Sequence, residues 1–240
     1  MSVVLETRAL DKRFGGVTVA KDIDFTLDAG DMHCLIGPNG AGKSTFFKLL
    51  LGEHAPDAGQ VLFKGKDITK LRPFARIREG ISVKFQVAGI FRALSVRQNL
   101  EIAFQHHLHG NGLDATIAEM LDFTALGAQA DVAAGTLSHG QQQWLEIGMA
   151  VGVEPSLLLL DEPTAGMSPD ETHRTGEMLR ELNDRGMTIL AIEHDMAFVQ
   201  QIARAVTVLH FGEVFARGTV GEITAHEGVE RIYLGTADDY

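Results

Sequence analysis

Cysteine is almost absent from this sequence, and its scarcity limits the chemistry available to the chain. The 240 residues include a single cysteine, Cys34, so no disulfide bond can form within the chain. Cys34 lies in the apolar run 32–36, where a buried thiol that contributes to packing is expected rather than a reactive one. Disulfide bonds within the chain are therefore excluded as a source of stability.

Long apolar runs and an excess of positive charge are also absent. No run approaches the ~18 apolar residues that a membrane span needs, and the first six residues contain no basic segment followed by an apolar core. We therefore expect no membrane-spanning helix, no signal peptide and a cytoplasmic location. With 21 Lys and Arg against 32 Asp and Glu, the formal net charge is −11. Such a surface repels nucleic acids and anionic lipids, so no nucleic-acid partner is expected, and a polyanionic ligand must be held by a local site.

The pattern of apolar residues predicts a single α/β domain. Short β-like runs separated by turns in the first ~30 residues predict an antiparallel β meander. Helical spacing dominates from about residue 94 to 151, and strands alternate with helices again from residue 157 onward. No internal repeat or low-complexity linker is visible. We expect a domain over residues 1–240 made of two parts: residues 1–86 and 152–240 as a core with an antiparallel β subdomain, and residues 87–151 as a helical insert.

A glycine-rich segment after an apolar strand matches the phosphate-loop pattern G-x-x-x-x-G-K-[ST] in full. It has the required context, since a strand precedes it and a helix follows it. Glycines let the backbone wrap around an anion, and the helix N-terminus adds partial positive charge. Lys43 would bridge the β- and γ-phosphates of a nucleoside triphosphate, and the Ser44 hydroxyl would bind Mg²⁺. The segment expected to bind the nucleotide comprises Gly37, Pro38, Asn39, Gly40, Ala41, Gly42, Lys43, Ser44 and Thr45.

Two carboxylates follow a second apolar strand. Residues 157–160 are four leucines, typical of a strand buried on both faces, and Asp161 and Glu162 come directly after them. A carboxylate at the carboxyl end of a parallel strand faces the crevice where ligands bind. We assign Asp161 to Mg²⁺, through a water molecule, and Glu162 to the general base, a role worth about 10²–10⁴-fold in rate. A simple turn before Pro163 is the alternative.

A third motif, just upstream of the acidic one, identifies the family that the sequence resembles. A pentapeptide similar to the signature of ATP-binding-cassette (ABC) ATPases, usually Leu-Ser-Gly-Gly-Gln, consists here of Leu137, Ser138, His139, Gly140 and Gln141. Ser138 is also well placed to cap the helix that follows. His139 replaces the usual glycine and adds bulk near the nucleotide. The resemblance covers the whole chain and implies the P-loop NTPase fold of an ABC ATPase, which hydrolyses ATP with Mg²⁺.

Three further residues match positions that this family uses. Gln86 resembles the Q-loop glutamine, which senses Mg²⁺ and the membrane partner, and His194 resembles the switch histidine, which contacts the γ-phosphate. Phe14 falls where the family has an aromatic residue that stacks on adenine, although a phenylalanine in the core is the alternative. By resemblance, the catalytic and Mg²⁺-binding residues are then Glu162, His194, Gln86, Ser44 and Asp161.

The loop after the acidic motif departs from the family pattern. Members commonly have an aspartate in this loop, whereas this chain has the sequence Ala-Gly-Met-Ser-Pro over residues 165–169. Ser168, Pro169 and Glu171 together predict a helix start with a cap, a proline in the first turn and a capping box. Communication across a dimer would then use Ser168 or the main chain.

The resemblance also implies partners. Because the signature is carried on the helical insert, it implies a head-to-tail dimer, with itself or with a homologous ATPase subunit, that holds ATP between the two copies. Membrane-spanning permease subunits and, indirectly, a solute-binding protein would complete the assembly at the cytoplasmic face of the inner membrane. Residues 87–94 are apolar but include Gly89 and Arg92, which indicates an exposed docking surface that would face the membrane subunit.

Finer details are similar to the ATPases of branched-chain amino-acid and urea importers. The similar segments are residues 13–16, 165–169, 193–196 and 232–235, and the run 143–149 is most similar to a urea-importer subunit. We therefore expect urea as the solute, with branched-chain or hydrophobic amino acids, or short amides, as the alternative. A soluble ABC protein of DNA repair or translation is the alternative class, although such proteins usually carry two cassettes or long coiled coils. A P-loop kinase or GTPase is disfavoured because the sequence has no Asn-Lys-x-Asp motif.

Overall fold

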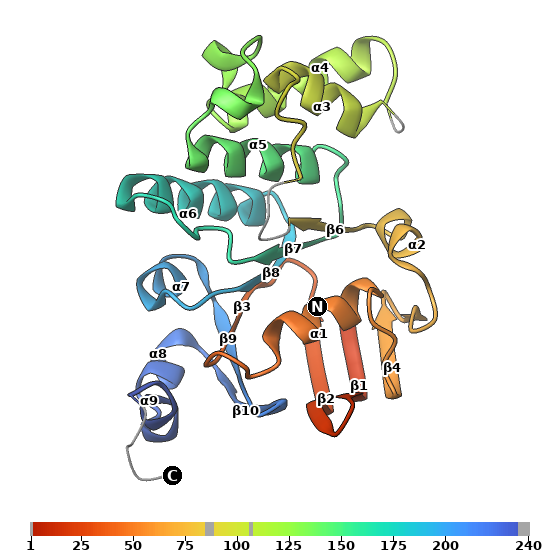
Figure 1. The fold of residues 1–240 in the computed structure, drawn as a ribbon, viewed down its shortest axis with the longest axis vertical. Helices are drawn as coiled ribbons and strands as arrows, with labels where there is room; N and C mark the ends of the chain where they lie inside the picture. Colours follow the sequence, from red (N-terminus) through yellow and green to blue (C-terminus); the bar gives the residue numbers. More distant parts are fainter. Residues whose placement is uncertain (1, 85–88, 106–107, 235–240) are drawn as a thin grey trace.

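The computed structural model describes residues 2–84, 89–105 and 108–234, and within them the chain forms two β-sheets with helices around them (Figure 1). The smaller sheet is antiparallel and comes from the N-terminal part of the chain. Its strands are β1 (Val3–Phe14), β2 (Val17–Asp28), β4 (Ala58–Phe63) and β5 (Lys66–Asp67). They lie in the order β2-β1-β4-β5.

The first two strands are much longer than the sequence suggests. The expectation of several short strands near the N-terminus is wrong, because β1 and β2 each run for 12 residues. Register shifts interrupt their pairing, and Ala9 and Asp22 have positive φ angles of 46° and 49°. The N–H of Ala9 donates to Oδ1 of Asp24 over 2.8 Å. Because of these bulges, polar residues lie within one continuous pair of strands, although the sequence alone suggests turns at their positions.

The larger sheet brings the predicted motifs to one edge. Its strands are β3 (Met32–Ile36), β6 (Ile81–Lys84), β7 (Leu157–Asp161), β8 (Thr188–Ile192), β9 (Ala205–His210) and β10 (Glu213–Gly218). In the order β10-β9-β3-β8-β7-β6, neighbours are parallel except β10, which pairs antiparallel with β9. Parallel strands end at the same edge, so the loops after β3, β7 and β8 lie close together.

Helix α1 (Lys43–Leu51) lies between the two sheets (Figure 1). Its apolar side chains form one buried cluster with residues of both sheets. Arg76 of α2 (Pro73–Arg78) is fully buried and donates to the carbonyl oxygens of Leu49 and Leu50, over 2.7 Å in each case. These bonds satisfy carbonyls at the C-terminal end of α1 and help to fix the helix that follows the phosphate loop.

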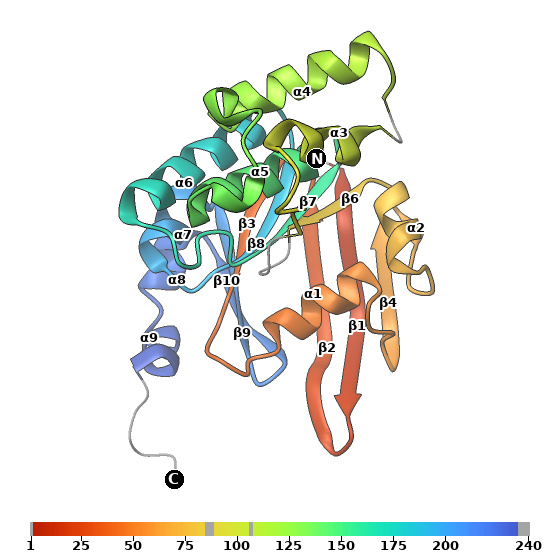
Figure 2. The same cartoon turned by 45° about the horizontal axis from the view of Figure 1, so that its top comes forward.

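The helices predicted between residues 94 and 151 are present and lie together at one end of the molecule (Figures 1 and 2). They are α3 (Val96–Phe104), α4 (Asn111–Phe123) and α5 (His139–Val151), with short 3₁₀ turns at Gly127–Gln129 and Ala134–Thr136. Helix α4 begins at Asn111, directly after Gly110, whose φ of 56° favours glycine.

The remaining helices belong to the core. They are α6 (Pro169–Asp184), α7 (Met196–Ile202), α8 (Val220–Thr224) and α9 (Glu227–Leu234). Ser168 caps α6 and Thr219 caps α8, each in a capping box with a glutamate three residues later. The capping box at Ser168 confirms the prediction from the sequence.

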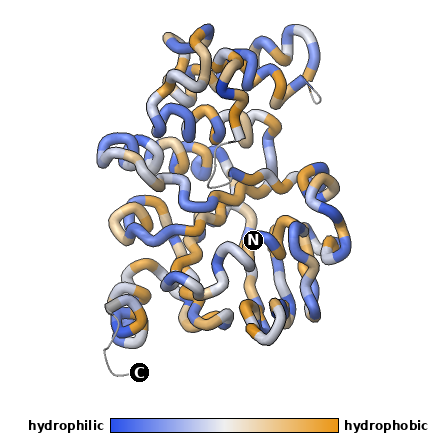
Figure 3. The backbone as a smooth tube through the Cα atoms, in the orientation of Figure 1, coloured by the Kyte–Doolittle hydropathy of each residue, from blue (hydrophilic) through white to orange (hydrophobic). Residues whose placement is uncertain are grey.

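Hydrophobic residues concentrate along the central strands (Figure 3). Alternate residues of these strands contribute to two buried clusters, one on each face of the larger sheet. None of the helices in the described part of the chain is both long and apolar enough to cross a membrane.

Candidate functional site

The phosphate-loop segment connects β3 to α1 and depends on two glycines. Gly37 has a φ of 149°, and a Cβ atom there would lie 2.2 Å from the carbonyl oxygen of Leu209. Gly42 has a φ of 102°, and a Cβ atom there would lie 2.4 Å from the carbonyl oxygen of Val19. A side chain at either position would collide with backbone, so the tight path of the loop requires glycine at both.

Lys43 lies at the base of the loop, in the first turn of α1. Its Nζ donates to the carbonyl oxygens of Gly37 over 2.7 Å and Pro38 over 3.0 Å. Burial lowers the pKa of Lys43, and the nearby Glu162 and Asp161 carboxylates oppose that shift. No described side chain caps the first turn of α1, so its backbone N–H groups are donors for an anion in the loop.

The loop lines an open cavity of about 210 Å³. The lining residues are Val19, Asn39, Gly40, Ala41, Gly42, Lys43, Ser44, Thr45 and Glu162. Most of the predicted phosphate-loop residues therefore surround one space, and the predicted general base borders the same space from β7.

Asp161 and Glu162 are adjacent at the carboxyl end of β7. Burial raises the pKa of Asp161, and the Glu162 charge raises it further, whereas Lys84 and Lys43 lower it. Glu162 has a φ of 46°, uncommon for a residue other than glycine. Such backbone strain, of about 1–3 kcal/mol, is concentrated at functional sites. Oε1 of Glu162 lies 3.6 Å from Nδ1 of His194, so the predicted base and the predicted switch histidine are brought together.

Sequence reasoning missed Glu193, which holds the loops after β7 and β8 together. Its side chain is buried and accepts hydrogen bonds from Oγ1 of Thr164, over 3.0 Å, and from the backbone N–H of His194, over 3.2 Å. Burial raises the pKa of Glu193. Its position directly after the apolar strand β8 is the signal that could have revealed it, because Asp161 and Glu162 were identified by the same pattern after β7.

The signature lies away from this cavity within one chain. Ser138 caps α5, and its Oγ accepts a hydrogen bond from the N–H of Gln141 over 3.2 Å, while Oε1 of Gln141 accepts from the N–H of Ser138 over 3.0 Å. The predicted cap is therefore confirmed. Ser138 and His139 are exposed, and residues 137–141 contribute nothing to the described lining of the phosphate-loop cavity.

Gln86 lies outside the described residues, but the residues that flank it contact a buried glutamate. Nζ of Lys84, at the end of β6, lies 3.8 Å from Oε2 of Glu146 in α5. Oε1 of Glu146 accepts a hydrogen bond from the N–H of Gly89 over 2.8 Å. Burial lowers the pKa of Lys84 and raises that of Glu146. Glu146 thus connects the helix that begins with the signature to both sides of Gln86, and sequence reasoning did not identify it.

Replacing Glu146 with alanine is expected to destabilise the fold by about 3 kcal/mol, because it removes one partner of a buried ion pair together with the acceptor of the Gly89 N–H. Thermal unfolding of Glu146→Ala would measure this. The control is Glu181→Ala, since Glu181 pairs with Arg185 at the surface, where loss of a pair costs about 1 kcal/mol or less. Equal melting temperatures for the two variants would contradict a structural role for the Glu146 pair.

Phe14 is exposed, which argues against the alternative that it is a core residue. Its side chain is 43% exposed at the end of β1, edge-to-face with His54 at a centroid distance of 5.2 Å. Nζ of Lys12 lies 5.4 Å from the ring centroid. An exposed aromatic ring is available to stack on a base, and this use of Phe14 stays a prediction.

If the Phe14 ring stacks on adenine, Phe14→Ala should weaken ATP binding by about 1–3 kcal/mol, the range measured for aromatic–base stacking. Titration calorimetry with ATP would measure the affinity. The matched control is Phe215→Ala, because Phe215 is exposed to a similar extent, 42%, on β10. If Phe14→Ala instead lowers the melting temperature as much as removal of a core phenylalanine would, and leaves the ATP affinity unchanged, Phe14 has a packing role.

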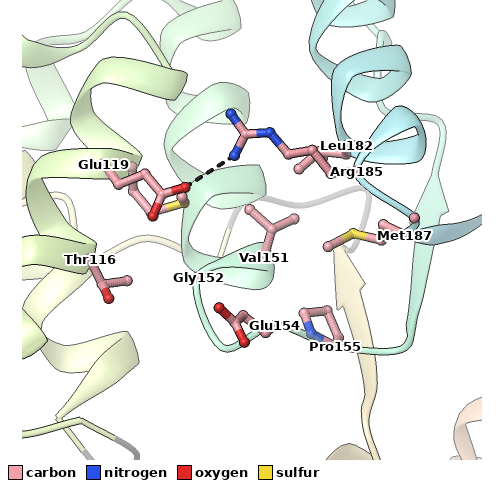
Figure 4. Close-up of a pocket in the computed structure, with 11 residues that line it drawn as sticks. Thr116, Glu119, Val151, Gly152, Glu154, Pro155, Leu182, Arg185 and Met187 are labelled. Atoms are coloured by element: carbon pink, nitrogen blue, oxygen red, sulfur yellow. Dashed lines mark hydrogen bonds and ion pairs between the residues drawn. The ribbon is translucent and has the colours of Figure 1, made fainter.

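A second cavity, of about 330 Å³, lies where α4, the α5–β7 connection and the end of α6 meet (Figure 4). Its lining includes Met120, Val151 and Leu182, and Glu119 forms an ion pair with Arg185 across it over 3.0 Å. No phosphate-loop, acidic-motif or signature residue is part of its described lining. It is a junction between helices rather than part of the candidate nucleotide site.

Comparisons with known proteins agree with these motifs. A family model described as "ABC transporter" matches residues 20–165. The chain is 34% identical to the high-affinity branched-chain amino acid transport ATP-binding protein BraF of Pseudomonas aeruginosa, with 98% of each protein covered. It is 36% identical to the autoinducer 2 import ATP-binding protein LsrA of an Enterobacter species, over 91% of this chain but only 43% of that protein.

A solved structure extends the similarity to the fold. The ADP conformation of MJ1267, an ATP-binding cassette of an ABC transporter, matches with a TM-score of 0.91 and 29% identity. That match covers 98% of this chain and all of the other. The two-sheet core and the grouped helices are therefore the arrangement of that cassette.

Proposed function

Because this chain belongs to the ABC transporter family and is an ATP-hydrolysing subunit of an importer, we propose that it works as one half of a pair that drives separate membrane-spanning subunits. One observation carries this proposal. Lys43 and Glu162 line one cavity and His194 lies beside Glu162, whereas Ser138 and His139 of the signature are exposed and are not part of the described lining of that cavity.

Each of the site residues is assigned its own role in ATP binding and hydrolysis. The loop N–H groups and Lys43 bind the phosphates of ATP, and Phe14 stacks on the base. Glu162 accepts a proton from the attacking water, and its closeness to His194 lets the histidine orient the γ-phosphate beside it. Gln86, outside the described residues, retains its assigned role as a sensor of Mg²⁺ and of the membrane subunits. Glu193 positions the Glu162 and His194 loops.

Residues in and next to the cavity fit Mg²⁺. Ser44 lines the cavity and offers a hydroxyl, and Asp161, which precedes the lining residue Glu162, offers a carboxylate. Hard oxygen donors of this kind, completed by substrate phosphates and waters, are those that Mg²⁺ prefers. Groups of three or more metal-binding His, Cys, Asp or Glu side chains are absent from the described residues, and the phosphates of the nucleotide would supply further ligands. Bound there, Mg²⁺ would neutralise charge on the phosphates.

The exposed signature needs a second chain. In a head-to-tail dimer, residues 138–141 of one copy would face ATP bound at the phosphate loop of the other copy. The partner is a second copy of this chain or a homologous ATPase subunit.

Phe91 is proposed as the contact with the membrane subunits. Its side chain is 51% exposed, but its backbone is held on both sides by buried Asn99 of α3. The N–H of Phe91 donates to Oδ1 of Asn99 over 2.7 Å, and Nδ2 of Asn99 donates to the Phe91 carbonyl over 3.1 Å. Ile90 packs against the core, so among the described residues 89–94 the docking surface is centred on Phe91.

The solute is proposed to be urea, on the resemblance of residues 143–149, with branched-chain amino acids as the second candidate because of the likeness to BraF. The subunit would work at the cytoplasmic face of the membrane, and a solute-binding protein would deliver the solute on the other face.

Co-purification from detergent-solubilised membranes, followed by uptake assays with labelled urea and labelled leucine, tests this proposal. Membrane-spanning subunits should co-purify with the tagged chain, and uptake of one solute should require an intact Glu162. Recovery of the chain alone from membranes, with uptake of both solutes independent of it, would favour a soluble ABC ATPase.

A further inference from the structure

Glu171 contacts the signature although it lies 33 residues away from Ser138 in the sequence. Its Oε2 accepts hydrogen bonds from the N–H and the hydroxyl of Ser168, over 3.0 and 3.1 Å, in the capping box of α6. Its Oε1 accepts a hydrogen bond from the hydroxyl of Ser138 over 3.0 Å. One carboxylate therefore joins the loop after the acidic motif to the signature serine.

Because Gly140 has no side chain, the Glu171 carboxylate can lie directly against it. A Cβ atom on Gly140 would lie 2.4 Å from Oε1 of Glu171. The carboxylate thus rests against the first turn of α5, where the helix dipole favours an anion. Hydrogen bonds from Ser168 and Ser138 hold the pKa of Glu171 below its usual value, so the group is charged at neutral pH.

The Ser138 hydroxyl has one proton to donate. In the single chain it donates to Glu171, whereas in the proposed dimer the signature serine faces the γ-phosphate of ATP bound by the partner. Both acceptors are anions, so they compete for the same proton and repel each other at short range. We propose that Glu171 is an internal competitor of partner-bound ATP at the signature, and that it sets the ATP concentration at which two copies close. This inference rests on the head-to-tail pairing proposed above.

The substitution Glu171→Gln distinguishes competition between Glu171 and ATP for the Ser138 proton from a purely structural role of Glu171 as a helix cap. Glutamine preserves a capping box, as Gln141 does for α5, but it removes the charge and can donate an N–H to Oγ of Ser138. The Ser138 proton is then free for the phosphate. In a Glu162→Gln background with saturating Mg-ATP, we expect Glu171→Gln to tighten dimerisation by about tenfold, measured by sedimentation velocity over a range of protein concentrations.

The control is Glu222→Gln in the same background. Glu222 closes the capping box of α8 on Thr219 with the same pattern of hydrogen bonds, far along the chain from the signature. It should leave the dimerisation constant unchanged. A dimer that is unchanged or weaker with Glu171→Gln would overturn the competition and leave Glu171 as an ordinary cap. If neither Glu162→Gln nor the double variant dimerises, the pairing itself fails, and the competition fails with it.

Discussion

Glu162→Gln is expected to lower ATP hydrolysis by about 10²–10⁴-fold, the usual contribution of a positioned general base. Glutamine keeps the size and hydrogen-bonding reach of the side chain beside His194 but cannot accept the proton of the attacking water. ATP binding should remain, because the phosphates are held by the loop and by Lys43. Phosphate release gives the hydrolysis rate, and calorimetry gives the ATP affinity.

The matched control is Glu154→Gln. Glu154 is also a glutamate with a positive φ, 50°, but it borders the second cavity rather than the phosphate loop. The Glu154→Gln variant should hydrolyse ATP at the same rate as the protein without substitutions. Hydrolysis by Glu162→Gln within a few-fold of that rate would assign the proton transfer to another group.

Phe91→Asp should abolish solute uptake by the assembled transporter while ATP binding by the isolated subunit stays nearly intact. The introduced carboxylate would place a charge in an apolar contact, whereas Asn99 holds the backbone at this position independently of the side chain. The measurement pairs uptake by membranes carrying the full complex with ATP binding by the purified variant.

Phe215→Asp is the control for this substitution, because Phe215 is similarly exposed but lies on β10, far from α3 (Figure 1). Normal uptake with Phe91→Asp would contradict the docking assignment. Loss of ATP binding together with uptake would mean that Phe91 supports the fold.

The sequence was sufficient to predict features that depend on local chemistry. The phosphate loop, the acidic pair after β7, the cap at Ser138 and the capping box at Ser168 are short patterns whose geometry follows from neighbouring residues. The meeting of Glu162 with His194 is consistent with a general rule, because loops after parallel strands share one edge of the sheet.

Features that depend on distant residues could not be predicted in this way. Glu146 lies 57 residues from Gly89, and Ser138 lies 33 residues from Glu171. Only tertiary packing brings these partners together. The length of β1 was missed because its bulges interrupt the alternation that identifies a strand. The role of Gln86 and the boundaries of the helical insert stay predictions.

The paired site is tested most directly by sedimentation velocity of Glu162→Gln beside Glu162→Gln/Ser138→Arg, each with and without Mg-ATP. Arginine at the exposed Ser138 would obstruct the signature face without reaching the phosphate loop of its own chain. We expect Glu162→Gln to become a dimer with Mg-ATP, and the double variant to bind ATP with similar affinity but to remain a monomer. A double variant that dimerises as readily, or that loses ATP binding as a monomer, would contradict a site shared between two copies.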